Sequence, residues 1–221
     1  MSPRKSSARR NRRKNGSILQ LDKIQLAGVA VVIVIVASSI WLYALTHKPT
    51  PKIKQWASAP PVTIDKSKQY FATVKMAKGG EFVMQLYPEK APITVNSFVF
   101  LAQQGFFNGV TFHRVLDGFM AQGGDPTGTG AGGPGYEFVN EDSDLTFDKA
   151  GVVAMANSGR NTNGSQFFVT FAPQPRLNGG YTIFGQVVSG MEVVNGLTRR
   201  NPDDKPNFPG DTIQSITISE K

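Results

Sequence analysis

The feature that most limits how this chain can fold is an uncharged stretch at residues 26–45, with the sequence LAGVAVVIVIVASSIWLYAL. Its only polar interruptions are Ser38 and Ser39. A helix of ~20 residues rises about 30 Å, the thickness of a bilayer's hydrocarbon core. A helix buried in a soluble core would show polar residues at a 3.6-residue period, whereas this run is apolar all round. The stretch therefore predicts a single transmembrane helix at residues 26–45.

The charge distribution predicts the orientation of that helix. Residues 1–25 carry a net charge of +7, residues 46–68 carry +4 and residues 69–221 carry −3, which together make the total of +8. The more basic flank of a membrane helix stays in the cytoplasm. We therefore expect a basic cytoplasmic tail at residues 1–25, a single pass through the cell membrane, and an extracytoplasmic C-terminal domain.

The same partition argues against a nucleic-acid partner, because a nucleic-acid-binding domain concentrates its positive charge on a folded surface. The body of this chain is instead mildly acidic. A nucleic-acid-binding arm at residues 1–25 is the alternative to a topology signal, which explains the same charges more simply. An uncleaved anchor is favoured over a signal peptide, whose apolar core spans only about 7–15 residues. Prolines and lysines at residues 46–68 predict an extended stem that separates the domain from the bilayer.

Residues 69–221 show the pattern of a mainly β domain. A hairpin is predicted from the β-rich runs at 70–76 and 81–87, which are joined through Gly79 and Gly80. A helix is predicted at 92–104, which opens on proline and is followed by Gly105. The remaining expected elements are strands near 110–115, 119–122, 151–155, 167–171, 182–188 and 212–219 and a short helix at 190–197. This order suggests a closed antiparallel barrel with a couple of helices.

Several kinds of chemistry are excluded by the residues present. The chain has no cysteine and only two histidines, His47 and His113, so neither a metal site nor a cofactor is expected. A G-x-G-x-x-G pattern ends at Gly133, but Pro134 follows it, so no helix opens there to hold a dinucleotide phosphate. A nucleophilic G-x-S-x-G elbow is also missing from the sequence.

Two long blocks resemble the signature sequences of the cyclophilins, FHRVLDGFMAQGGDPTGTG at 112–130 and MANSGRNTNGSQFFVTF at 155–171. The segments APITVNSFVFLAQQGFFNG at 91–109 and YTIFGQVVSGMEVV at 181–194 are similar to the family as well. The resemblance covers roughly residues 70–219. It implies an eight-stranded antiparallel barrel capped by two helices, with peptidyl-prolyl cis-trans isomerase activity on Pro-containing polypeptide clients and no cofactor.

The resemblance also implies roles for single residues. Arg114 matches the family's catalytic arginine, and Gln122 is the second residue expected to take part in catalysis. The walls of the proline pocket are expected to be Phe119, Met120, Phe168 and Leu177, with Tyr181 at the pocket rim. Asn157 and Gln166 match positions that hydrogen-bond the peptide backbone, and Ala156 and Ser158 match the adjoining shelf. The chain departs from many members at Arg176, which replaces a tryptophan, and at Tyr181, which replaces a histidine.

Three alternatives stay open at this level. Arg114 could be a surface residue paired with Asp117 rather than a catalytic group. The domain could be a Pro-peptide binding module with little catalysis, for which Arg176 leaves room. The function could also lie in the basic tail of a structural membrane protein. For the isomerase reading we expect a monomer.

Overall fold

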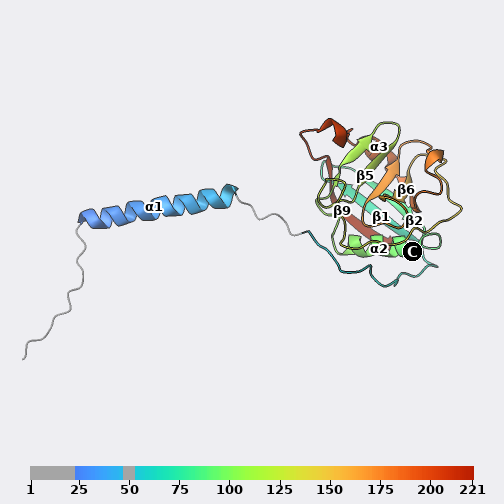
Figure 1. The fold of residues 1–221 in the computed structure, drawn as a ribbon, viewed down its shortest axis with the longest axis horizontal. Coiled ribbons are helices and arrows are strands. Elements are labelled where there is room, and N and C mark those ends of the chain that lie inside the picture. The colour runs from blue at the N-terminus through green and yellow to red at the C-terminus, as the bar shows by residue number, and fades with distance from the viewer. Residues whose placement is uncertain (1–22, 47–52) are drawn as a thin grey trace, which may run out of the picture. The chain divides into compact units, whose positions relative to one another are not determined.

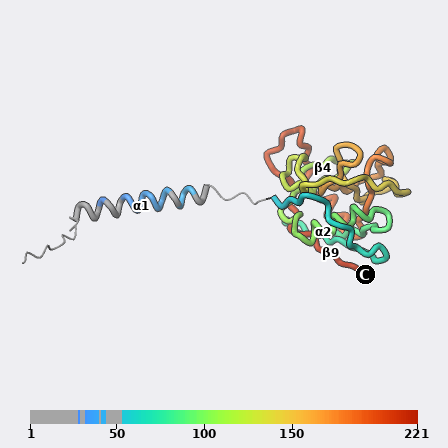
Figure 2. Tube along the Cα trace, turned by 60° about the horizontal axis from the view of Figure 1, so that its bottom comes forward, coloured from blue at the N-terminus to red at the C-terminus, as the bar shows by residue number. Residues whose placement is uncertain are grey.

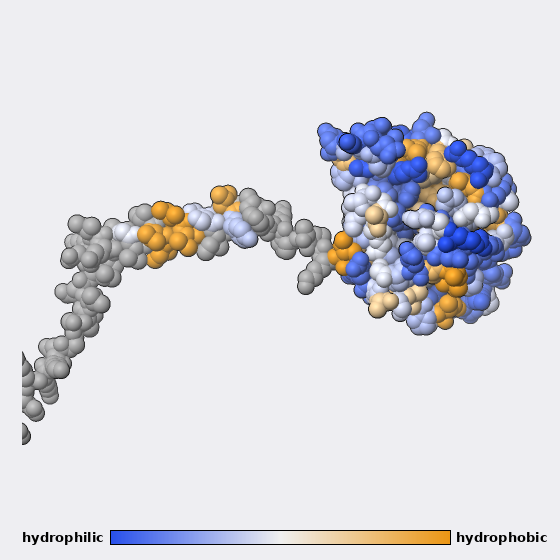
Figure 3. Space-filling view, in the orientation of Figure 1, coloured by the Kyte–Doolittle hydropathy of each residue, from blue (hydrophilic) through white to orange (hydrophobic). Residues whose placement is uncertain are grey.

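The computed structural model describes residues 23–46 and 53–221 and divides into two compact units, residues 1–51 and residues 52–221. In the first unit, α1 (Lys23–Thr46) covers the whole apolar run. Its described side chains from Val32 to Val36 are 51–66% exposed, and Figure 3 shows them as a hydrophobic band. Within the described residues, no helix combines the length and the apolarity needed to cross a membrane. The span at 26–45 therefore stays a prediction from the sequence, and residues 1–22 of the expected tail lie outside the described residues.

The second unit is an antiparallel barrel (Figure 1). Its described strands are β1 (Tyr70–Met76), β2 (Glu81–Leu86), β3 (Thr111–Phe112), β4 (Arg114–Leu116), β5 (Met120–Gly123), β6 (Val152–Met155), β7 (Phe167–Thr170), β8 (Ile183–Ser189) and β9 (Asp211–Glu220). They follow one another in the order β3-β9-β1-β2-β8-β6-β7-β5-β4. The expected hairpin is confirmed, since Tyr70 pairs with Leu86 and Lys75 with Glu81.

The barrel closes through a single short stretch of chain. β3 pairs with β9, and β4 pairs with β5. β3 and β4 are the two ends of the sheet order. Between them stands only His113. The expected strand at 110–115 is thus broken at His113, because its two halves bond to different neighbours. The expected count of eight strands is corrected to nine among the described residues.

The core fills with alternating side chains from the strands and one helix. In β1 the residues Tyr70, Ala72, Val74 and Met76 are buried, as a strand with one face on a core requires. Helix α2 (Pro92–Gln103) adds Phe98, whose ring lies near those of three other phenylalanines. Its centroid lies 5.0, 5.5 and 5.3 Å from those of Phe107, Phe167 and Phe184.

The remaining described helices are short. The helix expected at 190–197 is confirmed as α3 (Met191–Asn195), which Figure 1 shows on the side of the barrel away from α2. Two 3-10 turns were not expected from the sequence, η1 (Pro175–Leu177) and η2 (Pro202–Asp204). η1 bears on function, because Leu177 and the neighbouring Tyr181 reach the candidate site.

Residues 53–69, called here the docked segment, run along the barrel rather than away from it. Figures 1 and 2 show this cyan stretch beside α2. Trp56, Ala59 and Ile64 pack against the main core, and the Thr63 N–H donates to Asn96 Oδ1 of α2 at 2.9 Å. The expected stem at 46–68 therefore differs from the structure over 53–68, because aromatic and aliphatic side chains there find apolar partners on the barrel. Residues 47–52 of the stem lie outside the described residues.

Candidate active site

The candidate site begins as one row of side chains across four neighbouring strands. Arg114 on β4 is paired with Gln122 on β5, which is paired with Phe168 on β7, which is paired with Ala154 on β6. Because facing residues in a sheet point to the same side, the four share one face. A second hydrophobic cluster, separate from the main core, covers this face. Its buried members are Met120, Phe147, Val152, Ala154, Phe168 and Ile183.

A pocket of about 170 Å³ opens on this face. Nine residues line it, and every one was singled out from the sequence. They are Arg114, Phe119, Met120, Gln122, Ala156, Asn157, Phe168, Leu177 and Tyr181. Met120 and Phe168 are buried, whereas Phe119, Leu177 and Tyr181 are half-buried and stand at the sides. The tertiary structure thus brings together residues that are up to several strands apart in sequence.

Aromatic packing keeps the pocket's hydrophobic wall in place. The Phe168 ring meets the Tyr181 ring edge-on at 5.5 Å between centroids, and it stacks on Phe147 at 5.8 Å with an interplanar angle of 14°. Such pairs add about 0.5–1.5 kcal/mol beyond the area they bury. Phe147 was missed from the sequence, because nothing in the surrounding LTFDK stretch marks that loop as packing behind the site.

Arg114 is half-buried and has no carboxylate partner among the residues that the structure describes. None of the ion pairs among the described residues includes it. Its guanidinium carbon lies 5.7 Å from the centroid of the Phe119 ring, and Nη1 has only a 4.0 Å contact with Met120 Sδ. The alternative pairing of Arg114 with Asp117 is absent from the ion pairs of the described residues, and Asp117 instead accepts from Arg199 Nε at 2.9 Å. The guanidinium N–H groups of Arg114 are therefore available to a bound peptide.

Gln122 and Gln166 form a pair beside this arginine. Gln122 Nε2 donates to Gln166 Oε1 at 2.9 Å, and Gln166 Nε2 donates to the carbonyls of Gly130 and Gly132, each at 2.9 Å. Gln166 thereby ties β7 to the glycine-rich loop. Within the described residues Gln122 Oε1 has no hydrogen-bond partner, so it can accept an N–H group from a peptide.

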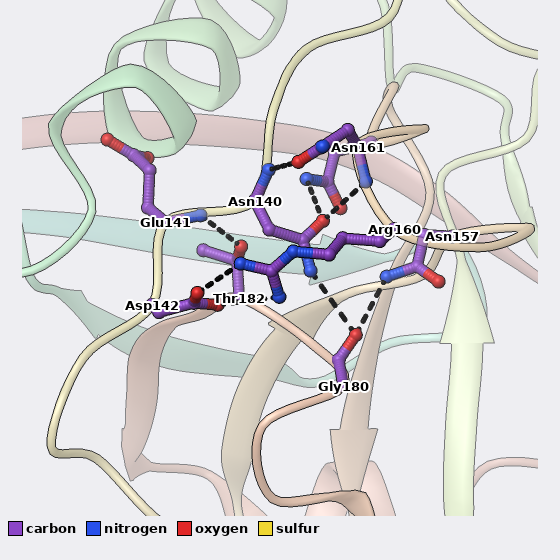
Figure 4. A network of polar contacts seen from close by, with 9 residues as sticks. Asn140, Glu141, Asp142, Asn157, Arg160, Asn161, Gly180 and Thr182 are labelled. Atoms are coloured by element: carbon purple, nitrogen blue, oxygen red, sulfur yellow. Dashed lines mark hydrogen bonds and ion pairs between the residues drawn. The ribbon is translucent and has the colours of Figure 1, made fainter.

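The amide of Asn157 is held by a polar network at the far side of the pocket, shown in Figure 4. Asn157 Nδ2 donates to the Gly180 carbonyl at 3.1 Å, and the same carbonyl accepts from Asn140 Nδ2 at 3.3 Å. Asn140 and Asn161 exchange backbone-to-side-chain bonds of 2.9 and 3.0 Å. These bonds join the 157–163 turn to Gly180, the residue before Tyr181, so they link two sides of the groove.

Ser158 and Gln166 do not line the small pocket. They line a neighbouring pocket of about 560 Å³, which shares Gln122, Ala156 and Asn157 with the first. The two hollows form one groove over the outer face of β5, β6 and β7. All eleven residues singled out from the sequence therefore border one groove.

The glycine-rich loop at 126–135 is held by a buried carboxylate. Burial alone would raise the pKa of Asp125, but hydrogen bonds from the Thr127 hydroxyl and from the backbone N–H groups of Thr127, Gly132 and Gly130 outweigh it. Its pKa therefore lies below the usual value, and Asp125 stays charged. A Cβ at Gly132 would lie 2.1 Å from Asp125 Oδ1, so the tight loop needs glycine there. The described residues hold no cluster of three or more potential metal ligands.

Comparisons with known proteins agree on one family. A family model described as cyclophilin type peptidyl-prolyl cis-trans isomerase/CLD matches residues 71–218. Peptidyl-prolyl cis-trans isomerase-like 1 of Aspergillus oryzae is 53% identical over 147 residues, which are 64% of this chain and 91% of that protein. The Mus musculus protein of the same name is 47% identical over 156 residues, 68% of this chain and 92% of that one.

Solved structures agree with the sequence relatives. A crystal structure of a cyclophilin type peptidyl-prolyl cis-trans isomerase from Cryptosporidium parvum has a TM-score of 0.63 and 32% identity, covering 69% of this chain and 99% of its own. A second structure of that protein, in the presence of the dipeptide Ala-Pro, has a TM-score of 0.62 and 32% identity, covering 68% and 99%.

Proposed function

The chain belongs to the cyclophilin-type peptidyl-prolyl cis-trans isomerase family, and on that premise we propose that the groove around Arg114 rotates X-Pro bonds of client polypeptides by non-covalent catalysis. The observation that carries this proposal is the single pocket lined by Arg114, the hydrophobic walls and Gln122. A related isomerase was solved in the presence of the dipeptide Ala-Pro, which supports binding of a prolyl peptide by a domain of this family.

The reaction needs no nucleophile. Rotation about a peptide bond faces a barrier of about 18–20 kcal/mol, because resonance is lost halfway. Both isomers of an X-Pro bond are populated, since they differ by only about 0.5–1 kcal/mol. A catalyst must therefore bind the twisted amide more tightly than the planar one. In the twisted amide the prolyl nitrogen regains a lone pair, and the unpaired guanidinium of Arg114 donates a hydrogen bond to it.

The other residues hold the client on either side of the rotating bond. Phe119, Met120, Phe168 and Leu177 enclose the proline ring, with Tyr181 at the rim. Gln122 Oε1 accepts a client N–H, while Asn157 and Gln166 bind the client backbone along the groove. Ala156 and Ser158 form the shelf between the two hollows. One side of the bond is thereby fixed while the other turns.

A Pro-peptide binding module with little catalysis is the competing function, and Arg176 beside Phe119 is the observation that favours it. A protease-coupled assay of the full-length chain with an X-Pro test peptide separates the two. The isomerase predicts turnover far above the uncatalysed rate, whereas the binding module predicts saturable peptide binding with no acceleration.

We further propose that residues 26–45 anchor the chain in the cell membrane, with residues 1–25 in the cytoplasm and the isomerase domain at 69–221 acting on proteins that fold outside it. The uncharged run and the +7 flank support this proposal. The exposed apolar side chains of α1 add to it, because a surface of this kind needs a cover. The residues that join the anchor to the domain are 46–68, and we propose a monomer.

Protease accessibility in intact cells tests the topology. Cleavage of the isomerase domain by a protease added outside, with the tail protected, is the expected result. Protection of the domain from the added protease would contradict the proposed orientation and indicate the opposite one. Deleting residues 1–25 tests the remaining alternative, in which the tail itself is the functional part. Loss of orientation alone agrees with an anchor, whereas loss of a binding partner at unchanged topology contradicts it.

A further inference from the structure

The larger hollow of the groove has a wall that comes from outside the family domain. The family model begins its match at residue 71, and the docked segment at 53–69 precedes it. Gln55 of that segment nevertheless lines the pocket of about 560 Å³, together with Gln122, Ala156 and Asn157. The glycine-rich loop lines the same pocket through residues 130–135.

The docked segment touches the loop through backbone atoms. The Trp56 N–H donates to the Pro134 carbonyl at 2.8 Å. Gly135 has a φ of +91°, and a Cβ there would lie 2.7 Å from the Trp56 carbonyl oxygen and 3.1 Å from Gln55 Cβ. Only glycine allows the two chains to approach this closely. The docked segment is therefore a third contact that holds the loop, beside Asp125 and Gln166.

Helix α2 and the turn that follows it hold the docked segment at two places. The Trp56 ring lies 5.2 Å from Phe100 and 5.9 Å from Phe106, measured between centroids. Further along, the buried amide of Asn96 accepts from the Thr63 N–H at 2.9 Å and donates to the Pro61 carbonyl at 3.0 Å. A buried asparagine whose hydrogen bonds go to this segment shows that the barrel is built to receive it.

The lining of the pocket indicates what it can bind. Glu137 is its only charged lining residue, and it takes part in none of the ion pairs of the described residues. The rest of the lining supplies amides, hydroxyls and backbone groups from Gln55, Ser158, Thr162 and the loop. A hollow of this size with one carboxylate fits a long basic side chain, whose alkyl stem can lie along the wall while its charge reaches Glu137.

We propose that the docked segment is a working part of the client-binding groove: Gln55 and Trp56 shape a second pocket in which Glu137 selects a lysine or arginine of the client near its X-Pro bond. The inference rests on the proposed isomerase function, because the pocket adjoins the residues that enclose the proline. Client choice is thereby set partly by a stretch of chain that the family domain does not contain.

The test uses the full-length chain in detergent micelles and X-Pro peptides that differ only in carrying Lys, Ala or Glu at one of the three positions before the proline. At one of these positions the kcat/KM for the Lys peptide should exceed that for the Glu peptide about fivefold at low salt, and the ratio should shrink at 1 M salt. Glu137→Gln and Trp56→Ala should each bring the ratio close to one.

Two matched variants serve as controls, Glu89→Gln on another surface and Ser58→Ala within the docked segment, and both should keep the native ratio. A ratio near one at all three positions in the native chain, with the Ala peptide still turned over, overturns the pocket and leaves the isomerase function intact. An unchanged Lys-to-Glu ratio of kcat/KM in Glu137→Gln also overturns the pocket and leaves the isomerase function intact.

A binding measurement keeps the inference testable even if catalysis fails. The chain has two tryptophans, Trp41 and Trp56. In a Trp41→Phe background, fluorescence reports only Trp56, beside the pocket wall. Tighter binding of the Lys peptide than of the Glu peptide supports the pocket, and equal binding contradicts it. Absence of turnover for every peptide would instead count against the proposed isomerase function.

Discussion

The guanidinium carbon of Arg176 lies 4.6 Å from the centroid of the Phe119 ring, which lines the pocket of about 170 Å³. Arg114 approaches the same ring at 5.7 Å, so Phe119 lies within reach of two cations. Cation–π contacts of this kind contribute about 0.5–1 kcal/mol at exposed sites. Arg176 thus covers the Phe119 ring, at a position where many cyclophilins have a tryptophan, but it offers no indole N–H there.

Arg176→Trp should therefore strengthen binding of cyclosporin-like macrocycles, which use the indole donor, about tenfold or more. Isomerisation of a short X-Pro peptide should change less than threefold. Titration calorimetry and the protease-coupled assay measure the two effects. Arg199→Trp is the matched control, since Arg199 covers Phe171 at 4.5 Å away from the pocket. Equal macrocycle affinity in the native chain and Arg176→Trp would contradict this account of the rim.

Arg114→Ala should keep the fold and lower kcat/KM for an X-Pro peptide about 10²–10³-fold, the usual loss when one transition-state donor is removed. Arg114 has no ion pair to lose, so the thermal unfolding midpoint should change little. The change should fall on kcat more than on KM, because the hydrogen bond forms mainly in the twisted state. Arg199→Ala controls for the loss of a surface arginine. Native turnover by Arg114→Ala would remove Arg114 from the mechanism.

His113 should make the fold sensitive to mild acid. Its side chain is 1% exposed, and neither ring nitrogen has a hydrogen-bond partner among the described residues. Burial lowers the pKa of His113, the Asp125 carboxylate and the Thr111 backbone oppose this shift, and the Arg200 and Arg114 guanidiniums add to it. The unfolded chain therefore binds a proton below about pH 6.5 that the folded chain does not, and stability falls as the pH falls below that value.

Urea unfolding of the native chain and His113→Gln between pH 7 and pH 5 measures this. The free energy of unfolding should decline with falling pH in the native chain and decline less in His113→Gln. Asp125 and Asp211 have pKa values below their usual range, so their contributions are lost only at more acid pH and do not overlap. Parallel pH profiles for the two chains would rule out His113 as the titrating group.

Glu141 should stabilise α2 from a distant loop. Its carboxylate accepts from the N–H groups of Ile93 and Thr94 at 2.9 and 2.8 Å and from the Thr94 hydroxyl at 2.8 Å, while Ala91 at the N-cap has no capping side chain. Glu141→Ala should reduce the free energy of unfolding by about 1–2 kcal/mol. Glu141→Gln should recover part of the loss, and Glu137→Ala, four residues earlier, should cost little. Chemical denaturation compares the variants.

Some features of the barrel could be predicted from the sequence, and others depend on contacts between distant segments. The strand at 110–115 was recognisable from its residues, yet its break at His113 was not, because the break arises when Thr111–Phe112 bonds to β9 and Arg114–Leu116 bonds to β5. The proline-rich stretch at 46–68 predicted a spacer, whereas residues 53–68 pack along the barrel. Trp56 could not reveal its partners, since Phe100 and Phe106 are brought to it only by the position of α2.

The sequence by itself determined the alternation of buried residues in the strands, the start of α2 at a proline and the family to which the domain belongs, because these follow from local periodicity and long contiguous motifs. It also named the residues around the proline pocket. Only the tertiary structure decided that Asp117 pairs with Arg199 rather than Arg114, that Glu141 caps α2 and that Gln55 borders the groove. Each of these contacts joins segments far apart in the chain, and no local pattern encodes which distant partner a side chain meets.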